Sequence, residues 1–240
     1  MRPYVIWSPP WDHKVGGIRA LYALRDGLLD RGADARLSGE PFDPDAIAVY
    51  PEIVQDNPFR VERIVRWRLN KSQVPNDGRV YDWMPCGDGA PLLTFDITDH
   101  DLLARREGPR SGTALVVRKG TRNPALVPPG AIEITREWPA DRQATIDILA
   151  SADYVVSFDE FTQLNDEACL LGTPVVIYPS GRWSRAEMES IGVMPDTCWD
   201  AADLGDAREA TRNAWPWHLE RIAAYPALLD QFIEETQARW

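Results

Sequence analysis

Three carboxylates crowd the start of a helix in the stretch 157–176, SFDEFTQLNDEACLLGTPVV. Asp159 and Glu160 follow the apolar strand DYVVS, and Glu167 lies further along the expected helix. The strand end puts the first two acids at the carboxyl edge of a sheet, where open α/β folds bind ligands. The helix begins near Thr162, whose hydroxyl and neighbouring N–H groups favour an anion. These residue types predict a site for an anionic ligand.

Glu167 is expected near the same face as Asp159, because the helix carries it about two turns further on. A carboxylate there would repel a phosphate, but it can accept hydrogen bonds from a ribose diol, as the acid of dinucleotide-binding folds does. In the structural alternative, Asp159 and Glu160 only cap the helix. Glu167 would then be a solvated helix residue.

The order of elements predicts an α/β fold in two halves. In the first half, a strand at 3–9, a helix from residue 18 and a strand at 45–52 open a parallel sheet. A helix at 57–70 and strands at 79–84 and 91–97 are expected next. The second half repeats this order with strands at 113–120, 131–137, 153–160 and 173–179, and with helices at 141–152, 161–172 and 184–192.

We therefore expect two Rossmann-like domains that face one another across a cleft. The polar stretch 100–112 is the candidate linker, which gives domains at 1–110 and 111–214. The tail at 215–240 reads as C-terminal helices that pack back on the first domain, and Pro226 interrupts or splits them.

Composition narrows the classes of function. The chain has 240 residues and a net charge of -11, which argues against duplex DNA as a partner because phosphate binding needs a dense cationic face. Its three cysteines, Cys86, Cys169 and Cys198, form no CxxC pair, which suits a reducing, cytoplasmic setting. No run approaches 18 apolar residues, so no membrane span is expected.

The segment 154–179 resembles the donor-binding segment of retaining glycosyltransferases with the GT-B fold. The resemblance rests on D-x7-E, formed by Asp159 and Glu167, followed by A-x-x-x-G-x-P-V-V. In that family the motif is usually E-x7-E, in which the second acid binds the ribose of a nucleotide-sugar donor and the first faces the sugar. Asp159 departs from the family's glutamate. Elsewhere the resemblance extends over most of the chain only as an order of elements.

Two further segments resemble the same family. The loop WDHKVGG is similar to its glycine-rich N-terminal loop, where Gly16 and Gly17 would let backbone amides approach a phosphate or the acceptor. In VVRKG, Arg118 and Lys119 stand where the family neutralises the donor diphosphate with a basic pair. The structural alternatives are a plain helix-entry turn and two surface cations.

The resemblance implies a hexosyltransferase of bacterial or phage type that uses a nucleoside diphosphate sugar, UDP- or GDP-linked, without a metal or other cofactor. The acceptor stays open between a glycan, a lipid, a protein and a nucleobase. A retaining enzyme needs no protein base, whereas an inverting one would need one, with His13, Asp82, Asp96 and His100 as candidates. Replacing Glu167 with alanine is expected to abolish turnover by weakening donor binding.

Two other readings stay open from the sequence. One is an epimerase or hydrolase that processes nucleotide sugars on the same fold. The other is a non-enzymatic binding module, an alternative supported by the aspartate at position 159. A dinucleotide oxidoreductase is disfavoured because no GxGxxG follows the first strand.

Overall fold

A computed structural model describes residues 1–104, 108–179 and 181–240. The chain divides into two compact units. The first unit holds Met1–Ile97 together with Arg221–Trp240, and the second holds Thr98–Glu220. Part of the candidate linker, at 105–107, lies outside the described residues.

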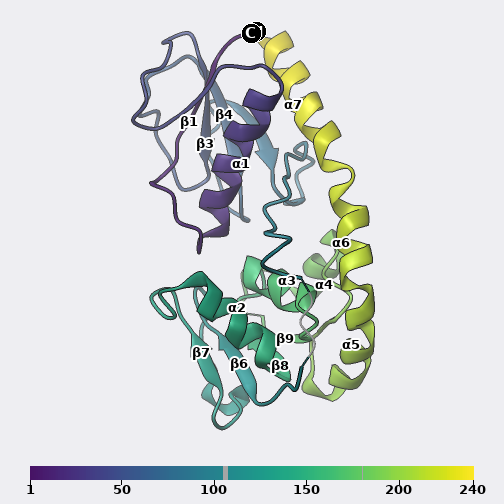
Figure 1. The fold of residues 1–240 in the computed structure, drawn as a ribbon. Helices are drawn as coiled ribbons and strands as arrows, with labels where there is room; N and C mark the ends of the chain where they lie inside the picture. Colours follow the sequence, from purple (N-terminus) through teal and green to yellow (C-terminus); the bar gives the residue numbers. More distant parts are fainter. Residues whose placement is uncertain (105–107, 180) are drawn as a thin grey trace. The chain divides into compact units, whose positions relative to one another are not determined.

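The first unit is built on a five-stranded parallel sheet with the order β2-β1-β3-β4-β5. Figure 1 labels β1, β3 and β4 of this sheet together with helices α1 and α7. One face packs on helices α1 and α7, whose leucines and Phe232 share a core with β1, β3 and β4. The elements of this unit are β1 (Tyr4–Ile6), α1 (Gly16–Asp30), β2 (Ala35–Leu37), β3 (Ile47–Pro51), β4 (Arg63–Arg68), β5 (Arg79–Asp82) and α7 (Tyr225–Arg239).

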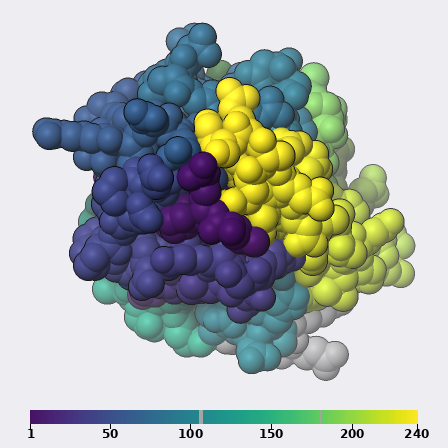
Figure 2. Space-filling model, turned by 90° about the horizontal axis from the view of Figure 1, so that it is seen from above, coloured from purple at the N-terminus to yellow at the C-terminus, as the bar shows by residue number. Residues whose placement is uncertain are grey.

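The C-terminal helix α7 is fixed to the first unit by side chains as well as by its apolar face. The Tyr81 hydroxyl donates to Glu235 Oε2 over 2.7 Å, and Arg31, the residue directly after α1, pairs with Asp230. Figure 2 shows the C-terminal residues beside the N-terminal ones, where the backbone N–H of Arg2 donates to Gln237 Oε1 over 2.7 Å. Pro226 lies in the first turn of α7, so the expected break in the tail is confirmed.

The helix expected at 57–70 was wrong, because this stretch contains the buried strand β4 (Arg63–Arg68). Its apolar residues pack on both faces of the sheet, with Val65 and Trp67 on one side and Ile64 on the other. Arg66 is fully buried, bound to Asp77 and set over the ring of Tyr50. A buried central strand carries no polar face, so periodicity alone misread it.

Two other details of the first unit differ from expectation. The strand expected at 91–97 is reduced to a single bridge between Leu92 and Asp82. A short edge strand, Ala35–Leu37, forms where only the end of a helix was expected, because α1 already ends at Asp30. Gly32 follows that end with φ 74°, the left-handed conformation that suits a helix-terminating glycine.

The second unit has its own five-stranded parallel sheet, in the order β10-β9-β8-β6-β7. Asp141 caps α2 by accepting from Ala144 N over 3.0 Å, and Ser184 caps α4 within a capping box. The elements of this unit are β6 (Thr113–Val116), β7 (Ile132–Ile134), α2 (Arg142–Ser151), β8 (Tyr154–Ser157), α3 (Gln163–Leu170), β9 (Val175–Ile177), α4 (Arg185–Ile191), β10 (Thr197–Cys198) and α5 (Leu204–Ala210), with α6 (Ala214–Ile222) reaching its boundary.

The two sheets share one topology. Subtracting five from each strand number of the second sheet turns β7-β6-β8-β9-β10 into 2-1-3-4-5, which is the order of the first sheet. In this doubly wound order, ligands bind at the carboxyl ends of strands 1 and 3, where the direction of winding reverses. The switch points are therefore β1/β3 in the first unit and β6/β8 in the second.

Candidate functional site

The switch point of the second unit is organised by Asp159, two residues beyond the end of β8. Its carboxylate accepts hydrogen bonds from three consecutive backbone amides on the loop after β6. Arg118 N donates to Oδ2 over 2.8 Å, Lys119 N donates to Oδ1 over 2.8 Å, and Gly120 N also donates to Oδ1. Asp159 is 3% exposed. Its side chain therefore ties two switch-point loops together.

Gly120 makes this close approach possible. A Cβ atom at position 120 would lie 1.7 Å from the backbone oxygen of Phe158, so a larger residue cannot occupy the loop as it stands. The turn after β8 is fixed from the other side as well. Ser157 Oγ donates to the backbone oxygen of Asp159 over 3.0 Å, and Asn165 Nδ2 donates to the same oxygen over 2.9 Å.

Glu160, the next residue, binds a different loop. Its Oε1 accepts from Arg182 N over 3.0 Å and from Trp183 N over 2.9 Å, on the loop between β9 and α4. Trp183 is buried, and its ring lies 5.4 Å from that of Phe161. Residue 180, within the loop that was expected to reach a donor, lies outside the described residues.

Four cationic side chains gather at this edge of the second sheet. Arg118 and Lys119 follow β6, Arg136 follows β7 and Arg182 follows β9. The pKa of the Lys119 ammonium is lowered, first by burial, which disfavours the charged form, and then by the positive charges of the three arginines. The negative charge of Asp159 opposes this shift. Lys119 nevertheless keeps exposed surface. The site therefore concentrates positive charge next to solvent, which favours an anionic ligand.

Helix α3 begins beside these loops. Thr162 is its N-cap, as expected, although the Thr162 side chain makes no capping hydrogen bond. The first N–H groups of a helix and its dipole add partial positive charge at this end. They act in the same sense as the four cations.

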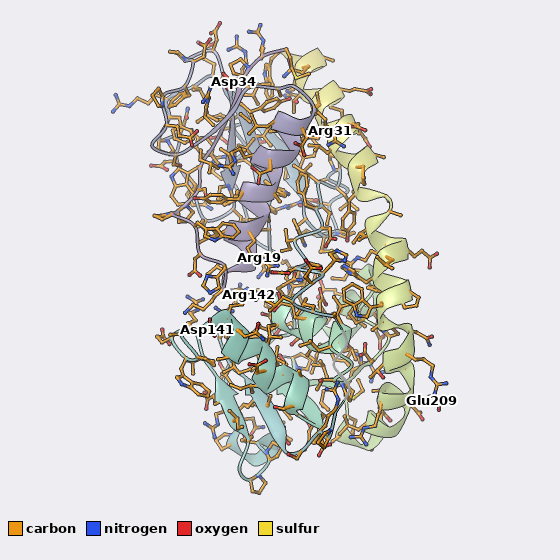
Figure 3. All side chains as sticks on the ribbon, viewed as in Figure 1. Arg19, Arg31, Asp34, Asp141, Arg142 and Glu209 are labelled. Carbon is orange, nitrogen blue, oxygen red and sulfur yellow. The ribbon has the colours of Figure 1, made fainter. Side chains whose placement is uncertain are left out.

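Glu167 lies further along α3 and is fully buried. Its carboxylate forms a two-point ion pair with Arg142, at 2.8 Å to Nη2 and 3.2 Å to Nη1. Arg142 is the first residue of α2, next to the cap Asp141 (Figure 3). This pair fixes the start of α2 against α3, so a ribose diol would have to compete with a guanidinium for Glu167.

The other expected site residues belong to the first unit. His13 is exposed on the loop after β1, and Gly16 and Gly17 open α1. A Cβ at Gly17 would lie 3.4 Å from Leu69 Cδ1, an ordinary contact that does not demand glycine. The chain thus places Arg118, Lys119, Asp159, Thr162 and Glu167 in the second unit, and His13, Gly16 and Gly17 at the switch point of the first.

Asp82, one of the alternative bases, is held by Arg68. It is 1% exposed and lies 2.6 Å and 3.0 Å from Arg68 Nε and Nη2, while Asp88 binds the same guanidinium. Both oxygens of the Asp82 carboxylate are therefore engaged by the guanidinium. His100 stacks near Trp215 and His218 in the second unit.

Sequence reasoning missed four residues of the site: Gly120, Arg136, Arg142 and Arg182. The glycine directly after the Arg-Lys pair was a usable signal, because close backbone approach is a reason for glycine at a strand end. Arg136 and Arg182 follow expected strands of the same sheet. The rule that parallel strands end at one edge would have grouped them with Lys119.

Comparisons with known proteins give little beyond this geometry. No family model matches the chain, and no curated protein matches it. Among solved structures, the chain is similar to an alpha-glucosyltransferase in complex with UDP and a 13-mer DNA containing a HMU base. That likeness has a TM-score of 0.46 and 9% identity, over 95% of this chain and 94% of that chain. It is too weak to assign roles to residues.

No helix among the described residues is both long enough and apolar enough to cross a membrane. The local geometry therefore carries the functional argument. It consists of a parallel α/β unit whose switch point gathers four cations and the start of a helix, with its two strand-end acids bound to backbone amides.

Proposed function

We propose that the second unit binds a nucleoside diphosphate sugar, UDP- or GDP-linked, and that the protein is a glycosyltransferase that moves the sugar to an acceptor. The observation that carries this proposal is the gathering of Arg118, Lys119, Arg136 and Arg182 around the β6/β8 switch point. A diphosphate carries concentrated negative charge, and doubly wound sheets bind nucleotides at this place. The D-x7-E segment lies at the same place.

Charge stabilisation would be the main catalytic contribution. Departure of the sugar leaves negative charge on the diphosphate, and Lys119, Arg118 and the start of α3 are placed to stabilise it. Groups that are fixed before the reaction need no reorganisation as charge develops. The proposal requires no metal ion in this step.

The stereochemical course depends on a base. Asp159 is engaged by three amides and Glu167 by Arg142, so neither is poised to accept a proton from an acceptor hydroxyl. Retention, in which the leaving phosphate activates the acceptor, fits these contacts. Inversion would need a base, for which His13, Asp96 and His100 are the candidates besides the ion-paired Asp82.

A nucleotide panel tests the donor site directly. Thermal unfolding is measured with UDP-, GDP- and dTDP-sugars, first without metal and then with magnesium or manganese. A ligand at about 100 times its Kd stabilises the folded state by roughly 2.7 kcal/mol, so the melting temperature rises. A rise with one sugar nucleotide in the absence of metal supports the proposal. No rise with any of them contradicts it.

A binding module without chemistry is the second candidate. The internal engagement of Asp159, Glu160 and Glu167 favours it, because the chain itself occupies both acids of the D-x7-E motif and the neighbouring Glu160. Release of free sugar from a bound donor, with no dependence on acceptor, would indicate a hydrolase instead. Tight binding without any turnover across a panel of glycan, lipid, protein and nucleobase acceptors would favour the binding module.

A further inference from the structure

We propose that Asp159 and Glu160 are a pair of positioning residues that set the spacing of the cations across the switch point. Neither acid would touch the sugar. This inference rests on the proposed function, because the ligand that needs the spacing is the donor diphosphate. It differs from what the family resemblance implies for the first acid, which is contact with the sugar.

The contacts of Asp159 leave it little capacity for a ligand. Its two oxygens already accept three N–H donors from Arg118, Lys119 and Gly120, and its side chain is buried. Charged acceptors form stronger hydrogen bonds than neutral ones, so a carboxylate fixes the main chain of this loop firmly. The fixed main chain determines where the side chains of Arg118 and Lys119 begin.

Glu160 does the same for the opposite loop. Its Oε1 holds the amides of Arg182 and Trp183, and the packing of Trp183 against Phe161 supports that segment. Because β8 lies between β6 and β9 in the sheet, the second and third residues after it are within reach of both neighbouring loops. Two consecutive acids can therefore hold one loop each.

The need for such a clamp follows from charge. Four cations around one point repel one another: burial is the largest cause of the lowered pKa of Lys119, and the positive charges of the three arginines lower it further. Loops that carry like charges would separate in the absence of a ligand unless something holds them. Two carboxylates on backbone amides hold the loops and offset part of the repulsion. The site is then ordered before a diphosphate arrives, which lowers the cost of binding.

The chemistry of the two clamps predicts different responses to conservative substitution. In Glu160→Gln, the amide oxygen can still accept from both Arg182 N and Trp183 N. In Asp159→Asn, only one oxygen remains for three donors, and the new NH2 group must face a backbone N–H. Glu160→Gln should therefore keep the loop in place, whereas Asp159→Asn and Glu160→Ala should release one loop each.

Two readouts test the proposal: amide hydrogen exchange without ligand, and calorimetric titration with UDP and with pyrophosphate. Amides 118–120 should exchange faster in Asp159→Asn, and amides 182–183 should exchange faster in Glu160→Ala, while Glu160→Gln stays like the wild type. Affinity for both probes should fall about tenfold or more in the two releasing variants and by less than about threefold in Glu160→Gln.

Equal losses of affinity in Glu160→Gln and Glu160→Ala, with amides 182–183 still protected, would overturn the proposal and give Glu160 a direct contact with the ligand. Unchanged exchange and affinity in Asp159→Asn would also overturn it. If wild-type protein binds neither probe, the proposed function is contradicted. The exchange pattern then still decides whether the clamps exist. Glu160→Gln keeps the experiment decisive if a releasing variant fails to fold.

Discussion

At the carboxyl end of the first sheet, one guanidinium, that of Arg68, binds the carboxylates of Asp82 and Asp88. At the same edge of the second sheet, one carboxylate, that of Asp159, binds three backbone amides. The two sheets have the same strand order, so topology does not explain the difference. In the first unit, charge is neutralised between side chains. In the second, the carboxylate binds main-chain N–H groups, and several cationic side chains lie nearby.

The same strand order therefore supports two different arrangements of charge. An arginine enclosed by two carboxylates, as in the first unit, is a structural element, and its hydrogen bonds with Asp88 hold the pKa of that carboxyl below its ordinary value. In the second unit, the Asp159 carboxylate instead orders the main chain of a loop through three backbone amides. Unequal charge at the strand ends supports our proposal that the second unit binds the anion.

The largest effect is expected from Arg142→Met in the second unit. This change leaves the fully buried Glu167 carboxylate without its two-point partner, which should destabilise the unit by about 3–5 kcal/mol. Urea unfolding measures it. Arg31→Met in the first unit is the matched control, because its pair with Asp230 is partly exposed and should contribute at most about 1 kcal/mol. Equal losses of stability in the two variants would contradict the view that burial makes the Arg142–Glu167 pair the more important one.

A pH-dependent effect of intermediate size should separate two buried aspartates. Burial raises the pKa of Asp196 in the second unit to about 6, whereas the unfolded value is about 3.9. The folded state therefore binds more protons between these values, and stability falls as pH rises from about 4 to about 6. Asp196→Asn should remove this fall and gain up to roughly 2–3 kcal/mol at pH 7.

Asp82→Asn in the first unit should do the opposite at pH 7, because it breaks the buried pair with Arg68. Denaturant unfolding at pH 4 and pH 7 measures both variants. A loss of stability at pH 7 in Asp196→Asn would contradict the view that this carboxylate is an unfavourable buried charge.

Alanine substitution at Gly120 and at Gly78 should reduce stability by similar amounts but differ in the effect on UDP binding. A Cβ at Gly120 would meet the Phe158 backbone oxygen at 1.7 Å, and one at Gly78 would meet the Ile64 backbone oxygen at 2.3 Å. Either alanine variant should destabilise its unit by about 1–3 kcal/mol. Only Gly120→Ala should abolish UDP binding, which calorimetry at a temperature below both transitions would test. If both variants lose UDP binding, the nucleotide site does not lie in the second unit alone.

The smallest effect on stability is expected from Lys119→Met. At neutral pH the free energy of unfolding should change by less than about 0.5 kcal/mol, while UDP affinity should fall about tenfold with the loss of a charged hydrogen bond. Lys71→Met in the first unit is the control and should leave affinity unchanged.

Because the folded pKa of Lys119 is lowered, wild-type stability should rise with pH between that value and the ordinary lysine value of about 10.4. The Lys119→Met variant should lack this rise. A rise of the same size in both proteins would mean that another group titrates there.

Local signals were most reliable where one residue type has one physical use. Asp141 and Ser184 cap helices because their side chains satisfy free N–H groups, and Pro226 begins a helix because it has no N–H to lose. The stretch 57–70 was misread because a strand buried on both faces has no alternation. Arg66 inside it is buried against Asp77, the ring of Tyr50 and the backbone oxygens of Val54 and Asp56. Those partners lie elsewhere in the chain.

The α/β class, the two successive halves and the positions of Asp159, Arg118 and Lys119 at strand ends could all be predicted from the sequence. These features depend on neighbours along the chain. Tertiary structure alone decided that Asp159 binds amides 118–120, that Glu160 binds the loop before α4 and that Glu167 pairs with Arg142. Partners that lie 22 to 41 residues apart in sequence meet only because parallel strands end at one edge of a sheet, and no local pattern records such a meeting.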